Sequence, residues 1–164
     1  MSDRPPASLT RMIDAHARLN EFFALHQEAL IDLDLPMARR HLDDHALAIG
    51  LHIREEEEVL LPVFARRAGR IAGGTTEIFE AEHRHILALV EDLRREVGTI
   101  RLDDPALRRR VIALFDREAL YKHLLDHHDR RERNVLYPVL DRVTSAEERE
   151  QMLAGCGMIR SSAS

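Results

Sequence analysis

The chain has 164 residues, of which 45% are hydrophobic and 32% charged, so it is long enough for one domain with a sizeable core and too short for two. Its net charge of -5 is spread along the chain without a basic stripe, so we expect no nucleic-acid partner. The single cysteine, Cys156, excludes an internal disulfide and a cysteine-based metal site within one chain, and no apolar run reaches the roughly 20 residues that cross a bilayer. We therefore expect a cytoplasmic protein without membrane contact.

Turn-forming residues divide the chain into four long segments and a short one, and apolar residues in the long segments recur at the helical spacings of three and four. These patterns predict long helices over about residues 8–33, 34–68, 75–98 and 103–141. The sequence from Ser145 to Glu148 is a capping box for a short fifth helix. Because short loops make neighbouring helices antiparallel, we predict an all-α protein: an up-down-up-down antiparallel four-helix bundle with a short C-terminal fifth helix.

The boundaries of these elements also predict the extent of the domain and its inner faces. We expect the domain over residues 8–142, after a tail of residues 1–7 and before a short helix and flexible tail over residues 143–164. Towards the ends of the second and fourth helices, the spacing predicts that these residues face the core: Val59, Val63, Val135 and Val139.

An internal echo relates the second and fourth helices. The segment from His52 to Pro62 reads HIREEEEVLLP, and the segment from His128 to Pro138 reads HDRRERNVLYP. A His, a Glu four residues on and a Pro ten residues on therefore occur in both segments. The echo indicates two related helical hairpins, which form a pseudo-symmetric frame suited to a two-metal site.

Histidines are unusually frequent, ten in 164 residues, and several lie on the otherwise apolar inner faces. A His and a Glu four residues apart lie on one helix face, and alone such a pair more often makes a surface ion pair than a metal site. On a core face, however, an unpaired carboxylate is costly to desolvate, which favours metal. The first and third predicted helices each have a His near their start, and the second and fourth each have a His/Glu pair near their end. In an antiparallel bundle these four positions lie at the same end. The candidate ligands are His16, His52, Glu56, His83, His128 and Glu132.

The chemistry of this set restricts the metal. Four imidazoles and two carboxylates without a thiolate suit iron, manganese or zinc, and two carboxylates among four nitrogen ligands are suited to bridging two ions. Each ion then has two nitrogens and two bridging oxygens. A solvent-derived oxo or hydroxo bridge is the expected fifth ligand, which leaves a position open for a small ligand such as oxygen, peroxide or nitric oxide.

From His16 to about Leu140 the chain resembles the hemerythrin-like family of HHE cation-binding domains. The family pattern has a His on the first helix, H-x3-E-E ahead of Leu-x-Pro on the second, a His on the third and H-x3-E ahead of a second Leu-x-Pro on the fourth. The matching residues are His16, His52, Glu56, Glu57, Leu60, Pro62, His83, His128, Glu132, Leu136 and Pro138. The resemblance implies a di-iron centre with two bridging glutamates, Glu56 and Glu132, and the four histidines as terminal ligands.

Two departures distinguish this chain from the oxygen carriers of the family. Those carriers have a further His four residues after the His of the third helix, where this chain has Leu87. Their fourth-helix carboxylate lies five residues after its His, whereas Glu132 lies four residues after His128. The four-histidine, two-glutamate set is instead similar to that of iron-sulfur repair proteins and of bacterial and F-box hemerythrin-like domains.

The sequence leaves the function open among related hypotheses. The first is a non-haem di-iron protein that binds, senses or reacts with oxygen, peroxide or nitric oxide, or handles iron, with zinc or manganese as alternative metals. The second is a catalase-like or peroxidase-like di-iron enzyme. The third is an iron-responsive regulatory or structural module whose partner is another protein or a second copy of the chain.

Four further polar residues fall on the inner faces, deeper in the bundle than the candidate site: His26, His45, Glu118 and Tyr121. The simpler interpretation is that each has an ordinary hydrogen-bond partner. The sharper hypothesis is a proton-relay network beneath the metals. Glu57 is expected near the mouth of the site.

Overall fold

A computed structural model of the chain describes residues 7–69, 71 and 73–157, and every regular element within these residues is helical. In chain order they are η1 (Leu9–Met12, a 3-10 turn), α1 (Ile13–Ile31), α2 (Leu35–Glu55), η2 (Glu56–Leu60, a π-helical segment), α3 (Leu61–Arg67), α4 (Thr76–Thr99), α5 (Leu107–Arg131), η3 (Glu132–Leu136, also π-helical), α6 (Tyr137–Val143) and α7 (Ala146–Gly155). The predicted all-α class is confirmed. Residues 1–6 and 158–164 of the predicted tails lie outside the described residues.

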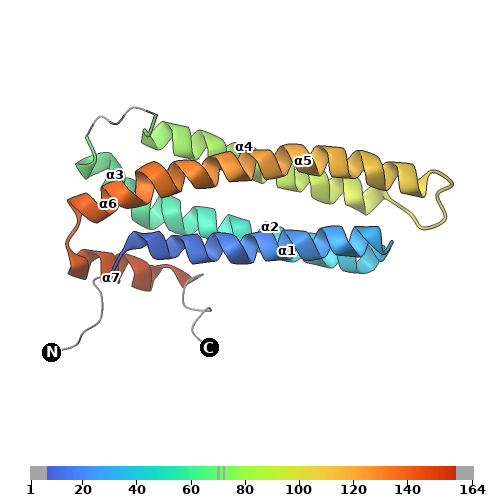
Figure 1. Ribbon diagram of the computed structural model, residues 1–164, viewed down its shortest axis with the longest axis horizontal. Coiled ribbons are helices and arrows are strands. Elements are labelled where there is room, and N and C mark those ends of the chain that lie inside the picture. Colours follow the sequence, from blue (N-terminus) through green and yellow to red (C-terminus); the bar gives the residue numbers. More distant parts are fainter. Residues whose placement is uncertain (1–6, 70, 72, 158–164) are drawn as a thin grey trace.

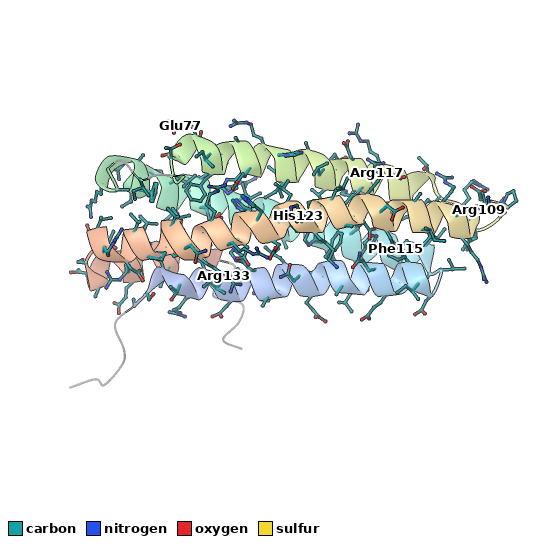
Figure 2. The ribbon with its side chains drawn as sticks, turned by 45° about the horizontal axis from the view of Figure 1, so that its top comes forward. Glu77, Arg109, Phe115, Arg117, His123 and Arg133 are labelled. Carbon is teal, nitrogen blue, oxygen red and sulfur yellow. The ribbon has the colours of Figure 1, made fainter. Side chains whose placement is uncertain are left out.

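The helices form a bundle (Figure 1). α1 packs against α2, α2 against α4, and α4 against α5. α3 follows α2 through η2 and α6 follows α5 through η3, so the described residues form a bundle of four rods: α1, α2 to α3, α4, and α5 to α6. α7 packs against η2 at one end. Charged side chains such as Glu77, Arg109 and Arg117 lie on the outside of the bundle (Figure 2). In the described part of the chain, no helix is long and apolar enough to span a membrane.

The helix ends follow local hydrogen bonding. The predicted capping box is confirmed, because the Ser145 hydroxyl accepts from the Glu148 N–H while the Glu148 carboxylate accepts from the Ser145 N–H. The predicted start of the fourth long helix, at about residue 103, was about four residues too early. The Asp104 carboxylate accepts from the Ala106 N–H, which makes a separate turn, and α5 begins only at Leu107.

The two π-helical segments were not predicted, and each begins at one of the candidate glutamates. The N–H of Leu61 bonds to the carbonyl of Glu56, five residues back, and the N–H of Tyr137 bonds in the same way to the carbonyl of Glu132. A proline follows each of these donors by one position, and proline neither donates an N–H nor fits an unbroken α-helical turn. The wider turn accommodates the proline, and π-bulges of this kind recur at functional sites.

The extra residue in each π-helical segment changes which residues face the core. After η2, Leu60 and Phe64 are buried, whereas Val59 and Val63 are only half-buried, so the inner face has moved by one residue from the predicted positions. After η3, Val135 is likewise half-buried and its place is taken by buried neighbours, although Val139 is buried as predicted.

The apolar core consists of two clusters, one on either side of the candidate ligands along the bundle. One contains Leu19 of α1 and Ile53 of α2. The other contains Met12 of η1 and Leu60 of η2. His16 lies between Met12 of one cluster and Leu19 of the other along the chain, and Glu56 likewise lies between Ile53 and Leu60. The candidate ligands therefore form a polar layer with an apolar cluster above and below it along the bundle axis.

Candidate metal centre

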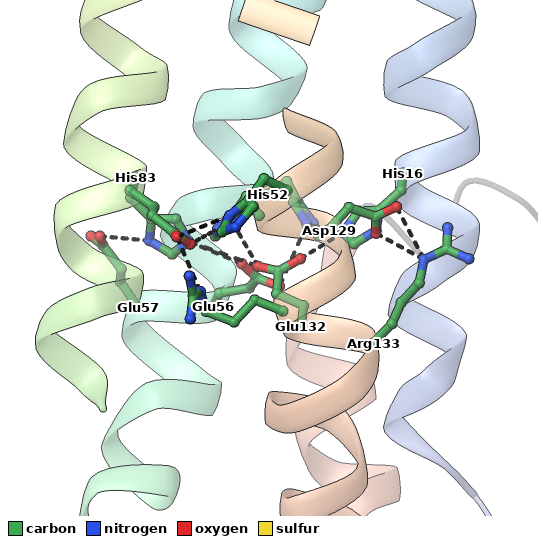
Figure 3. Close-up of polar contacts among 12 residues, drawn as sticks. His16, His52, Glu56, Glu57, His83, Asp129, Glu132 and Arg133 are labelled. Atoms are coloured by element: carbon green, nitrogen blue, oxygen red, sulfur yellow. Dashed lines mark hydrogen bonds and ion pairs between the residues drawn. The ribbon is translucent and has the colours of Figure 1, made fainter. Parts of the chain in front are cut away.

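The structure brings all six candidate ligands together in this layer (Figure 3). Each is buried, with at most 6% of its surface exposed. They come from all four rods of the bundle: His16 from α1, His52 from α2, Glu56 from η2, His83 from α4, His128 from α5 and Glu132 from η3. The six side chains therefore lie at the same level along the bundle axis, as the sequence predicts for antiparallel helices.

The ligand atoms form two groups that share both carboxylates. One group contains His16 and His52, the other contains His83 and His128, and Glu56 and Glu132 belong to both. Within each group the ligand atoms lie within 4.8 Å of one another. Each group offers two imidazole nitrogens and two carboxylate oxygens, as expected for two neighbouring metal positions.

Each glutamate turns one oxygen towards each group. Glu56 Oε1 lies 3.5 Å from His52 Nε2, and Glu56 Oε2 lies 3.3 Å from His83 Nε2. Glu132 Oε2 lies 3.1 Å from His16 Nε2, and Glu132 Oε1 lies 2.7 Å from His128 Nε2. This is the arrangement in which a carboxylate bridges two cations.

Several of these buried atoms lack a conventional partner. Among the residues that the structure describes, His83 Nε2, His128 Nε2, Glu56 Oε2 and Glu132 Oε1 make no well-directed hydrogen bond, and their close contacts are the ion pairs with one another. A buried polar atom without a partner costs about 1–3 kcal/mol, and more when charged. A cation between them removes this cost, so the residues present fit a metal ion.

Carboxylates from neighbouring rods hold three of the histidines on their other ring nitrogen. His83 Nδ1 lies 2.9 Å from Glu57 Oε1, and His128 Nδ1 lies 2.8 Å from Glu82 Oε2. His16 Nδ1 makes an ion pair with Asp129. Because an ionised carboxylate only accepts, each Nδ1 carries the proton and each Nε2 is directed at the centre, which is the usual support of a metal-bound His.

The same neighbours determine the charge of the site. Burial alone would lower the pKa of His16, but Asp129 and Glu132 outweigh it and raise the pKa to about 10. Burial is likewise outweighed at His128, where Glu132 and Glu82 raise the pKa to about 10. Despite its own burial, the pKa of Glu132 is held well below its usual value, first by the charge of His128. A cation that binds here must therefore displace protons from the histidines.

Tyr137 is a member of the site that the sequence analysis missed. Its hydroxyl donates to Glu56 Oε1 at 2.8 Å and lies 3.3 Å from both His16 Nε2 and Glu132 Oε2. Burial and the two carboxylates raise the pKa of Tyr137 well above its usual value, so the hydroxyl keeps its proton. The available signal was the internal echo, in which Tyr137 stands where the second helix has Leu61.

A cavity of about 290 Å³ leads to the candidate ligands from the side of the bundle between α1 and α5. Its apolar lining includes Leu19, Phe23, Ile49 and Leu125, its polar lining includes Gln27 and Lys122, and four candidate ligands also line it: His16, His52, His128 and Glu132. The cavity is large enough for a small molecule to approach the site.

The deeper polar residues have ordinary hydrogen-bond partners, which confirms the simpler interpretation. His26 Nε2 lies 2.8 Å from Glu118 Oε1, and His26 Nδ1 lies 2.7 Å from the Ala38 carbonyl. The second oxygen of Glu118 accepts from Gln27 at 2.8 Å. The proton-relay hypothesis stays a prediction.

His45 provides a test of this deeper layer by pH. Burial lowers the pKa of His45 to about 4, and the neutral ring donates to the Leu19 carbonyl and accepts from the Tyr121 hydroxyl. Between its ordinary pKa of 6.5 and this lower value the unfolded chain binds a proton that the folded chain does not, so stability falls as the pH drops. We expect this residue to contribute a loss of up to about 3 kcal/mol between pH 6.5 and 4.

Urea unfolding of the wild type and of His45→Gln across this pH range measures the contribution. The variant lacks the titrating ring, so its free energy of unfolding should fall less than that of the wild type. Parallel pH profiles for the two proteins would show that His45 is not held neutral in the folded chain.

Comparison with known proteins adds an independent result. The family model described as the hemerythrin HHE cation binding domain matches residues 8–140 of the 164-residue chain. No curated protein and no solved structure matches the chain. The matched segment contains all six residues of the two groups and exceeds half of the chain. The chain therefore belongs to the hemerythrin HHE cation-binding family.

Proposed function

We propose that this chain is a non-haem di-iron protein of the cytoplasm, in which His16, His52, His83 and His128 are terminal ligands and Glu56 and Glu132 are bridges. The observation that carries the proposal is that the two groups of ligand atoms share both carboxylates. The frame is an up-down-up-down bundle that spans residues 8–142. Zinc and manganese are the alternative metals for the same donor set.

The bound ions would supply Lewis acidity and exchangeable electrons to a small ligand such as oxygen, peroxide or nitric oxide. The side chains around them have separate tasks. Glu57, Glu82 and Asp129 orient three of the imidazoles. The Tyr137 hydroxyl holds a proton beside the carboxylate oxygens, and the cavity of about 290 Å³ gives a small molecule access to the candidate ligands. These features support a site that admits a small ligand.

A catalase-like or peroxidase-like enzyme is the second candidate. Cleavage of a peroxide needs a proton near the oxygen that leaves, and the Tyr137 hydroxyl, 2.8 Å from Glu56 Oε1, is such a donor. Steady turnover of peroxide by the iron-loaded protein would favour this candidate over a protein that only binds or senses its ligand.

Anaerobic loading with ferrous iron tests the proposal. After removal of unbound metal we expect two iron ions per chain. The absorption spectrum should then change in distinct ways when oxygen, peroxide or nitric oxide is added separately. Iron at well under two per chain, or an unchanged spectrum with all three ligands, would contradict the proposed function.

A further inference from the structure

The two groups of ligand atoms have the same composition but different hydrogen bonding. We call the group of His83 and His128 the inner position and the group of His16 and His52 the cavity position, because both histidines of the second group line the cavity, whereas only His128 of the first group does. Glu56 and Glu132 give one oxygen to each position.

At the inner position the four donor atoms contact one another. They are the Nε2 atoms of His83 and His128, Glu56 Oε2 and Glu132 Oε1: His128 Nε2 lies 2.7 Å from Glu132 Oε1 and His83 Nε2 lies 3.3 Å from Glu56 Oε2, and none of the four makes a well-directed hydrogen bond to another described residue. A cation that binds here replaces contacts among its own ligands and displaces no further group. The inner position is therefore preorganised for metal.

At the cavity position the corresponding atoms are already engaged. The Nε2 atoms of His16 and His52 lie 2.9 Å apart in hydrogen-bond contact. The Tyr137 hydroxyl donates to Glu56 Oε1 and also lies 3.3 Å from Glu132 Oε2, and these are the two oxygens that face this position. A cation here must displace these contacts, which opposes binding.

The two positions also differ in the carboxylates that hold the Nδ1 atoms of their histidines. Both histidines of the inner position have one, Glu57 for His83 and Glu82 for His128. Glu82 is itself fixed by Arg131, whose guanidinium also donates to the Gly73 carbonyl.

At the cavity position only one of the two histidines has such support. Asp129 pairs with His16, whereas His52 Nδ1 is buried and has no hydrogen-bond partner in the described part of the chain. The sequence gives the reason. Glu82, which precedes His83 on α4, supports His128 of the neighbouring helix α5. The corresponding residue before His16 on α1 is Ala15, and its side chain has no polar group that could support His52 of α2.

We propose that the two metal positions differ in affinity: the inner position binds first and tightly, and the cavity position binds second and exchanges its ion. Tyr137 and Glu82 are the positioning residues that set this difference. The inference rests on the proposed two-metal function, and it specifies the order in which the positions are filled.

Zinc alone is a suitable probe, because it has no redox chemistry. In a titration against a chelator of known affinity we expect two separate steps. In crystals grown with one equivalent of zinc, the anomalous signal should lie between His83 and His128. A second equivalent should add the signal between His16 and His52.

Three variants assign the steps to residues. Glu82→Gln should weaken the first step by about 10-fold to 100-fold and leave the second nearly unchanged. Tyr137→Phe should strengthen the second step by about 10-fold, because no hydroxyl competes for Glu56 Oε1. Glu58→Gln is the matched control, since Glu58 is an exposed neighbour of Glu57, and both of its steps should equal those of the wild type.

The outcomes separate this inference from the proposed function. Two zinc ions that bind with equal affinity, or a first ion at the cavity position, would overturn the inference and leave the two-metal centre intact. Binding of fewer than two ions per chain by the wild type would overturn both. Circular dichroism of each variant shows whether an altered step comes from a loss of the fold.

Discussion

Glu132→Gln is expected to reduce metal loading from two ions per chain to one or none. Glu132 is completely buried and gives Oε2 to the position of His16 and Oε1 to the position of His128. Glutamine has nearly the same shape, but it carries no charge and its nitrogen cannot ligate, so it cannot bridge two cations. Glu56→Gln should have the same effect, since Glu56 is the second shared carboxylate.

Metal analysis after anaerobic loading and desalting measures this change. Glu58→Gln provides the control, because it removes an equal charge from an exposed position in the π-helical segment that contains Glu56 and should still bind two ions. If Glu132→Gln and Glu56→Gln both retained two ions per chain, the carboxylates would not be bridges and the proposed centre would be wrong.

The candidate ligands could be predicted from the sequence because helical geometry constrains them strongly. A His and a Glu four residues apart on an apolar helix face must point into the core together, as His52 and Glu56 do. Antiparallel neighbours then bring early residues such as His16 to the height of late ones such as Glu132. These rules need only the spacing along each helix and the approximate position of each turn.

The side chains that support the ligands could not be predicted in this way. Glu82 and Asp129 lie beside ligands in sequence, yet they hold histidines of other rods, so their role depends on how neighbouring helices are rotated. The π-helical segments alter that rotation by one residue, which is why Val59 and Val63 were expected in the core and Leu60 and Phe64 occupy it. Tyr137 faces the centre for the same reason, one residue after η3 ends.

Removal of metal is expected to lower the thermal midpoint of unfolding by about 15 to 30 °C. A ligand at 1,000 times its dissociation constant stabilises the folded state by about 4 kcal/mol, so two such ions contribute about 8 kcal/mol. In a chain of this size each kcal/mol corresponds to about 2–4 °C. The layer of buried histidines and carboxylates gives the structural reason, because without cations atoms such as His83 Nε2 and Glu132 Oε1 are buried in the core without a well-directed hydrogen bond.

Calorimetry of the metal-loaded protein, before and after treatment with a chelator, measures the shift. Glu132→Gln separates the contribution of the centre from any general effect of the chelator: because the variant holds one ion or none, treatment should lower its unfolding temperature by at most half as much as that of the wild type. A wild type whose midpoint did not move would mean that the two apolar clusters stabilise the bundle without the layer between them. The bound ions would then serve the chemistry of the site and contribute nothing to the stability of the fold.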